Sequence, residues 1–323
     1  MEVLMIKHVL APLDGSVLAE SVLPHIMSIS LVLNAQVSLL HVIERNDKDW
    51  AHAIDPIDWH VRKDKAKKYI EEKAKPFIKK GLKVHTILKE GNPAEHIINY
   101  TYENDVDLVI MSSHGQSGIS DWNIGSVVQK VMMGIPCSTL LVRASHTEEQ
   151  VECLKYKTIF IGLDCSPQAE FVLPLAGSIA EHYKAKLVLG TVIKKVELLN
   201  HLPFSHEEEK LLEKVLDLSK KEAQSYLEKI KTQLEVKNLH VETRLGIHNN
   251  ISSALMDMVD EVKADLVLLS AHGHSSEGRH SFGSMATSFI VYGNKTSLIM
   301  QNLPYNRPKP VQSILSKRGS KEF

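Results

Sequence analysis

Residues 112–126 (SSHGQSGISDWNIGS) place three glycines and several hydroxyl and amide side chains between an apolar run and a helical pattern. Backbone N–H groups in such a loop, together with the N-terminus of a helix that starts at Ser126, can bind the oxygens of a phosphate. Gly115 and Gly125 would let the backbone come close to that anion. The loop has no G-x-x-x-x-G-K-[ST] pattern, and so no lysine to reach a phosphate. These residues predict a phosphate-binding loop without a catalytic lysine.

An acidic residue, Asp14, follows the first apolar run of the chain, HVLAPL at 8–13. If this run and the run that ends near residue 112 are neighbouring parallel strands, both loops lie at the sheet edge where ligands bind. A carboxylate in that position can accept hydrogen bonds from a ribose hydroxyl or a base edge. Asp14 and the glycine-rich loop together therefore predict a nucleotide site.

The same features occur a second time. VLAPLDGS at 9–16 matches IFIGLDCS at 159–166, so Asp164 corresponds to Asp14 at an offset of 150 residues. DLVIMSSHG at 107–115 matches DLVLLSAHG at 265–273, now at an offset of 158. Several matches in the same order indicate a tandem duplication, whose copies differ in length between their second and fourth strands.

Short β-branched runs alternate with amphipathic stretches in each copy, and in the first copy these runs are HVLAPL, QVSLLHVI, KVHTILKE, DLVIMSS and STLLVRA. Alternating strands and helices, with strands that are apolar on both faces, predict an α/β fold with a parallel, doubly wound sheet. We expect two tandem domains, 1–146 and 154–303, followed by a flexible tail at 304–323.

The spacing G-x-x-G-x(9)-G-[ST], with an aspartate closing the first strand, is the ATP-binding signature of the universal stress protein family. The chain resembles a tandem universal stress protein over nearly its full length. Its two versions of the motif read Ser112-SH-Gly115-QSGISDWNI-Gly125-Ser126 and Ser270-AH-Gly273-HSSEGRHSF-Gly283-Ser284. Both begin with serine where the family has glycine, and a serine hydroxyl there could contact a phosphate.

The resemblance implies a five-stranded parallel sheet with helices on both faces in each domain. It also implies pairing of the two domains through their last strands, with a homodimer as a further assembly. ATP, with or without Mg²⁺, is the implied ligand. Adenine and ribose would contact Pro12, Asp14 and Val42 in the first copy, and Asp164 and Val192 in the second. The phosphates would contact Ser112, Gly115, Gly125, Ser126 and Val127 in the first copy, and Ser270, Gly273, Gly283 and Ser284 in the second. The first copy keeps more of the pattern, because Gly162 and Cys165 replace Pro12 and Gly15 in the second.

The composition limits the partners. A formal net charge of −1 over 323 residues gives no general attraction to nucleic acid or to an anionic membrane. No run approaches the roughly 18 apolar residues that span a bilayer, and the N-terminus does not have the pattern of a signal peptide. The three cysteines include no C-x-x-C pair, as is typical of a reducing compartment. We expect a cytoplasmic protein that binds neither nucleic acid nor membrane.

Other chemistries have weaker support in the sequence. His272 and His274 invite a metal site, but His114 stands at the repeat position of His272, which favours a loop-shaping role for both. Ser113 and His114 could suggest nucleophilic catalysis, yet adjacent residues of a strand point to opposite faces. Three functions remain open: an ATP-binding module of the stress response without efficient catalysis, a weak ATPase or phosphotransferase, and a nucleotide-free scaffold.

Overall fold

The structure is a computed structural model that describes residues 6–44, 56–116, 118, 124–143, 153–195, 206–274 and 282–301. Residues 6–143 are called the first half below, and residues 153–301 the second half. The elements of the first half are β1 (His8–Pro12), α1 (Val17–Glu20), α2 (Leu23–Leu33), β2 (Gln36–Ile43), α3 (Pro56–Lys79), β3 (Val84–Glu90), α4 (Pro93–Glu103), β4 (Leu108–Ser112), α5 (Ser126–Gly134) and β5 (Ser138–Val142). Those of the second half are β6 (Thr158–Gly162), η2 (Ala169–Val172), α6 (Leu173–Tyr183), β7 (Lys186–Lys194), α7 (His206–Glu235), β8 (Val241–His248), α8 (Ile251–Glu261), β9 (Leu266–Ser270), α9 (Ser284–Tyr292) and β10 (Ser297–Met300).

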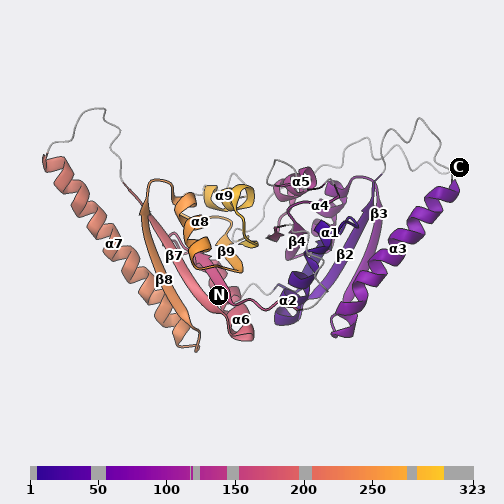
Figure 1. Cartoon of the computed structure of the whole chain (residues 1–323), viewed down its shortest axis with the longest axis horizontal. Coiled ribbons are helices and arrows are strands. Elements are labelled where there is room, and N and C mark those ends of the chain that lie inside the picture. Colours follow the sequence, from indigo (N-terminus) through magenta and orange to yellow (C-terminus); the bar gives the residue numbers. More distant parts are fainter. Residues whose placement is uncertain are drawn as a thin grey trace.

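The strands form a single ten-stranded sheet in the order β3-β2-β1-β4-β5-β10-β9-β6-β7-β8. All pairings within each half are parallel, which confirms the predicted doubly wound α/β fold. At the centre, β5 and β10 pair antiparallel, with Leu140 opposite Leu298. The two halves therefore lie side by side with the long helices α3 and α7 at the outer ends (Figure 1).

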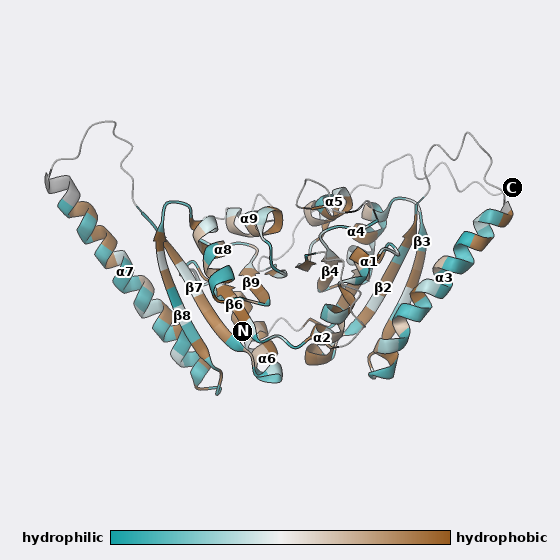
Figure 2. Cartoon of the chain, viewed as in Figure 1, coloured by the Kyte–Doolittle hydropathy of each residue, from teal (hydrophilic) through white to brown (hydrophobic). Residues whose placement is uncertain are grey.

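Helices cover both faces of the sheet because the strands alternate apolar side chains to both sides. In β4, Leu108 and Ile110 pack into a core with α2, α3, α6 and α7, whereas Val109 and Met111 face the core below α4 and α5. In the second half, α8 and α9 close the corresponding core. The strands are largely hydrophobic and the outer helices α3 and α7 carry many hydrophilic residues (Figure 2).

Two aspartates in each half fasten the first strand to the fourth. At the start of β1, the Asp107 carboxylate accepts hydrogen bonds from the backbone N–H groups of Lys7 and His8, at 2.7 and 3.0 Å. Asp265 does the same for Lys157 and Thr158, at 2.7 and 2.9 Å. The second aspartate lies at the opposite strand end, where the candidate site is found.

Candidate functional site

The two loops expected to form the site do meet. β1 and β4 are neighbours, with Val9 opposite Leu108, so the loops that follow them leave the sheet at the same edge. β6 and β9 are neighbours in the same way, with Ile159 opposite Leu266. The sequence predicted that these loops meet if their strands are neighbours. Since β1 and β4 do pair, the proximity of the Asp14 loop to the loop after β4 is confirmed.

Asp14 connects these loops through both of its carboxylate oxygens. Oδ1 accepts from the backbone N–H of Ser16 at 2.9 Å and from its hydroxyl at 2.6 Å. Oδ2 accepts from the backbone N–H of Gln116 at 2.6 Å, across the gap between the loops. The Ser16 hydroxyl also accepts from the N–H of Ala19 at 3.1 Å and so caps α1. The carboxylate thus fixes the local structure, and it retains acceptor capacity for a ligand.

Asp164 repeats this arrangement in the second half. Its Oδ1 accepts from the N–H and hydroxyl of Ser166 at 3.1 and 2.6 Å, and its Oδ2 accepts from the N–H of His274 at 2.7 Å. Because the sequence reasoning considered only a ligand as the donor, it missed this bridging role. The signal that could have found it is the serine two residues after each aspartate, whose hydroxyl accepts from the N–H group three residues further on, at 3.1 and 3.2 Å.

Gly115 and Gly273 are glycines because of these aspartates. A Cβ atom at Gly115 would lie 2.1 Å from Asp14 Oδ2, and one at Gly273 would lie 2.0 Å from Asp164 Oδ2. Such distances are far below any van der Waals contact. The sequence analysis explained Gly115 by the close approach of a bound anion. The close approach of an aspartate side chain already requires glycine at both positions.

Gly125 and Gly283 stand immediately before α5 and α9, as predicted. Gly125 has an ordinary extended conformation, with φ −69° and ψ 155°, and neither glycine has a side chain to cap its helix. Their own N–H groups donate to the carbonyls of Ser113 and Ala271, at 2.8 and 2.7 Å. The N–H groups available to an anion are therefore those of the following first turn, which begins at Ser126 and Val127 or at Ser284.

The hydroxyls of Ser112 and Ser270, at the start of the two motifs, have different surroundings. Ser112 is the last residue of β4 and lies on the same face as Leu108 and Ile110 by strand alternation, away from α5. Its buried hydroxyl has no hydrogen-bond partner among the described residues. Ser270 instead donates its hydroxyl to the carbonyl of His272 at 2.8 Å. The Ser270 hydroxyl thus already donates a hydrogen bond within the loop.

The side chains of Ser113 and His114 contact each other, although the sequence analysis expected them to point to opposite faces of the sheet. Ser113 lies beyond the end of β4, so strand alternation does not separate the two side chains, and their Oγ and Nδ1 atoms are 3.1 Å apart. Both residues are buried, as is His272 at the equivalent position. Among the described residues, no group of three or more His, Cys, Asp or Glu side chains is arranged to hold a metal ion. A third histidine of the same loop, His280, lies outside the described residues.

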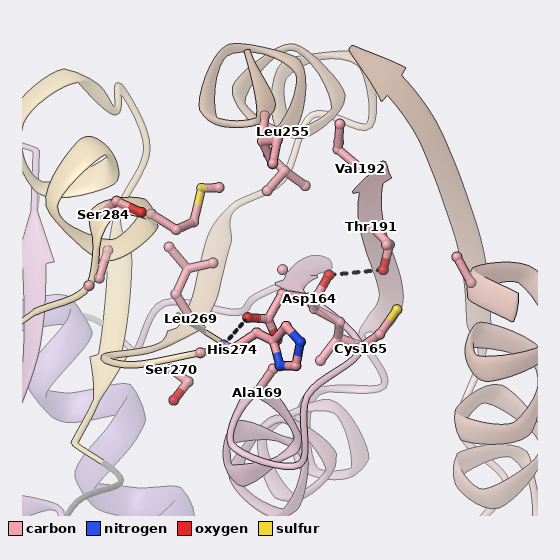
Figure 3. A pocket seen from close by; sticks show the side chains of 18 of the residues that line it. Asp164, Cys165, Ala169, Thr191, Val192, Leu255, Leu269, Ser270, His274 and Ser284 are labelled. Carbon is pink, nitrogen blue, oxygen red and sulfur yellow. Dashed lines mark hydrogen bonds between the residues drawn. The ribbon is translucent and has the colours of Figure 1, made fainter. Parts of the chain in front are cut away.

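A cavity of about 590 Å³ opens at this edge of the second half (Figure 3). Val192, Leu255 and Leu269 form an apolar wall on the side of α8 and α9, next to Ser284 at the start of α9. Asp164, Gly273 and Gly283 also line the cavity, as do Gly162 and Ser270. In the first half, the half-buried Pro12 and Val42 lie at the corresponding ends of β1 and β2. The predicted residues of the second copy are therefore brought together around one space.

Cys165 takes the place of Gly15 in a left-handed backbone conformation. The φ angle is +64° at Cys165 and +87° at Gly15, a region that favours glycine. Burial, and then the charge of Asp164, raise the pKa of the Cys165 thiol. The Cys165 thiol is therefore a weaker acid than an ordinary cysteine thiol.

Comparison with known proteins follows the same division into two halves. The sequence model of the universal stress protein family matches residues 5–143 and again residues 155–295. The chain belongs to the universal stress protein family. Universal stress protein YxiE of Bacillus subtilis is 30% identical over 149 residues, which are 43% of this chain and 100% of that protein. A universal stress protein of Methanocaldococcus jannaschii is 26% identical over 146 residues, or 44% of this chain and 85% of that one.

A solved structure extends the likeness to both halves. The crystal structure of a universal stress protein from Archaeoglobus fulgidus superposes with a TM-score of 0.63 at 18% identity, covering 92% of this chain and 99% of that one. At this identity the comparison establishes the fold. Within the described residues, no helix combines the length and apolarity that crossing a membrane requires.

Proposed function

We propose that this universal stress protein binds adenine nucleotide, with ATP as the ligand, as a binding module of the stress response without efficient catalysis. The observation that carries the proposal is the second-half cavity, where an apolar wall, a carboxylate and an uncapped helix N-terminus surround one space. These are the groups that a base, a ribose and a chain of phosphates require. The resemblance of the loop to the family's ATP signature supports the same ligand.

Each group of the nucleotide has a proposed contact. In the second half, adenine would pack near Val192, the ribose would donate to Asp164, and the phosphates would accept from the first turn of α9 after Gly283. In the first half, Pro12, Asp14 and Val42 would hold the base and sugar, and the first turn of α5 at Ser126 and Val127 the phosphates. Phosphate oxygens would supply most ligands of an accompanying Mg²⁺.

Efficient phosphoryl transfer is not part of the proposal. That reaction needs cationic groups on the transferred phosphate and a residue that orients the nucleophile. Among the described residues that line the second-half cavity there is no lysine or arginine. Binding without fast turnover is the function that this lining favours.

Calorimetry with Mg-ATP tests the proposal, with two ATP bound per chain as the expected result. A Cβ at Gly125 would make only ordinary contacts, the closest at 3.5 Å to the Ser113 carbonyl, so an alanine fits there without displacing its neighbours. Gly125→Leu should lower the stoichiometry to one, because the larger side chain enters the space in front of the α5 N-terminus. Gly125→Ala is the matched control and should keep both sites.

Three results would change the proposed function. No heat and no thermal shift at millimolar ATP would favour the nucleotide-free scaffold. An unchanged stoichiometry in Gly125→Leu would refute the assignment of the first-half phosphate site. Phosphate release above a buffer blank would favour the weak ATPase.

We further propose that the two halves are domains 1–146 and 154–303, which stay paired through β5 and β10 in solution, and that the protein is cytoplasmic. The antiparallel pairing of Leu140 with Leu298 supports the first point, and free cysteines support the second. Light scattering separates a chain of 36.2 kDa from a homodimer of twice that mass. Limited proteolysis tests the boundary between the domains and the tail at 304–323, and cell fractionation tests the location.

A further inference from the structure

Positive charge is concentrated on the outer helix of the first half. Residues 62–83, from the second turn of α3 to the residue before β3, include ten basic and three acidic residues, a formal charge of +7. Arg62, Lys63 and Lys73 each pair with a carboxylate. The other lysines of α3 are exposed and have no ion-pair partner among the described residues. They are Lys65, Lys67, Lys68, Lys75 and Lys79.

Four of these lysines lie on one side of α3. Lys65, Lys68, Lys75 and Lys79 follow one another at spacings of three, seven and four residues, which place side chains along a single stripe of a helix. We call these four residues the α3 lysine row. The buried Phe77 lies on the opposite side of the helix, in the core, so the row faces away from the sheet. Since α3 stands at an outer end of the molecule, the row is presented to solvent (Figure 1).

The same stripe continues toward the start of α3 with two apolar side chains. Val61 and Ile57 stand four and eight residues before Lys65 and are 43% and 71% exposed. Residues four apart on a helix are neighbours on its surface. The stripe therefore has an apolar end, formed by Ile57 and Val61, and a cationic remainder, formed by the α3 lysine row.

The second half shows that the fold does not require these lysines. The helix α7 has the place of α3 in the repeat, with Tyr226 at the position of Tyr69. The positions of the α3 lysine row are occupied there by Glu222, Ser225, Thr232 and Val236. Over residues 219–240, which correspond to 62–83, five basic and three acidic residues give a formal charge of only +2. Packing on the sheet is thus compatible with an almost neutral outer helix, and the charge on α3 needs another explanation.

The lysines also repel one another. Lys65 and Lys68 are three residues apart, and Lys75 and Lys79 are four apart, so each pair brings like charges together on the helix surface. Such pairs destabilise a helix. An anionic partner would remove this repulsion on binding, which is the behaviour expected of an electrostatic docking surface.

We propose that the stripe formed by Ile57, Val61 and the α3 lysine row binds an acidic amphipathic helix of another protein. Charge complementarity calls for carboxylates opposite the row, and the apolar end calls for a partner that also presents apolar side chains. The stripe lies on the side of α3 away from the sheet, so it is separate from the proposed nucleotide sites.

Two features favour a protein helix over other anionic partners. Arginine and aromatic side chains are typical of surfaces that bind nucleic acid, whereas the exposed row consists of lysines and the nearby Arg62 is paired with Asp58. Glu72 lies on the same stripe, between Lys68 and Lys75. A carboxylate at that place opposes a uniformly anionic surface such as a lipid bilayer, but it can pair with a basic side chain of a helix.

Titration calorimetry of the full chain with a synthetic helical peptide of about five turns tests the proposal. The peptide carries leucine on one face with glutamate beside it, and the same peptide with glutamine in place of glutamate is the neutral probe. The acidic peptide should bind, and the neutral one should bind at least about tenfold more weakly. Lys68→Glu with Lys75→Glu should weaken binding of the acidic peptide by about tenfold or more through the reversed charge. Ile57→Ser with Val61→Ser should weaken it by about fivefold through the lost apolar contact.

Lys214→Glu with Lys221→Glu is the matched control, because these exposed lysines of α7 have the same seven-residue spacing as Lys68 and Lys75. It makes the same change in net charge and should alter the affinity less than about twofold, since salt screens distant surface charges. Unchanged melting temperatures in the variants would confirm that lost binding is not lost folding.

Several results would overturn the proposal. No heat with the acidic peptide at millimolar concentration, equal binding of the acidic and neutral peptides, or unchanged binding in both stripe variants would each do so. Tighter binding of duplex DNA or of phosphatidylglycerol vesicles than of the acidic peptide would replace the protein helix with a polyanion or a lipid surface as the partner.

Discussion

Gly115→Ala probes the contact between the two loops of the site most directly. The new Cβ would fall 2.1 Å from Asp14 Oδ2, so the carboxylate must move by more than an ångström. That movement breaks the 2.6 Å hydrogen bond from the N–H of Gln116. Hydrogen bonds to charged groups contribute about 1.5–3 kcal/mol. Gly115 has no left-handed φ that would add backbone strain. We therefore expect a loss of about 2–3 kcal/mol in unfolding free energy.

A double-mutant cycle with Asp14→Ala tests the cause of this loss. Without the carboxylate, Gly115→Ala removes nothing further and should cost less than about 1 kcal/mol, which gives a coupling energy near 2 kcal/mol. Urea unfolding followed by circular dichroism measures all four proteins. Gly273→Ala with Asp164→Ala repeats the cycle in the second half, where the distance is 2.0 Å. Additive effects in both halves would refute the reasoning.

Three further perturbations are expected to act away from the site. Gly190→Ala should destabilise the protein by about 3 kcal/mol or more by overpacking, because its Cβ would lie 2.1 Å from the Phe160 ring; Phe160→Leu should restore most of the urea midpoint. Burial lowers the pKa of His25 to about 4, so the folded state binds this proton less readily than the unfolded chain. Stability should then fall by about 2.5 kcal/mol as the pH drops from 6.5 to 4, and His25→Gln should flatten this pH profile. Arg143→Met should lower the free energy of unfolding, measured in urea, by about 2 kcal/mol, because the guanidinium donates to the carbonyls of Phe289 and Ile290 at 2.6 and 2.9 Å across the two halves.

The arrangement of the site could be predicted from the sequence because it follows from general rules for parallel sheets. Apolar runs identified β1 and β4, and the repeat showed that Asp14 and Asp164 share one role. The carboxyl ends of neighbouring parallel strands lie at one edge, so the loops had to meet if those strands were adjacent. Pro24 also fits the preference of proline for the first turn of a helix. Because α1 ends at Glu20 and α2 begins at Leu23, Pro24 lies in the first turn of α2, where its missing N–H is tolerated.

The reasons for individual residue types could not be predicted, because they depend on distances between atoms far apart in the sequence. Gly115 is required by a side chain that lies 101 positions earlier in the chain (115 − 14). The contact of Ser113 with His114 depends on the residue at which β4 ends, and boundaries are the least certain feature of any pattern. Thr191 lines the second-half cavity together with Tyr226, whereas His41 at the same repeat position packs its ring against Tyr69.

The two halves also share a hydrophobic core, and this affects how a ligand in one half acts on the other. The largest buried apolar cluster includes Ile26 of α2 and Ile179 of α6, and Leu140 and Leu298 from the paired central strands. The Tyr183 hydroxyl donates to the Ser28 carbonyl at 3.0 Å, so polar contacts join the halves as well. Unfolding one half would expose part of the core of the other. A ligand that binds either half therefore stabilises the whole chain, by about 2.7 kcal/mol at a hundred times its dissociation constant.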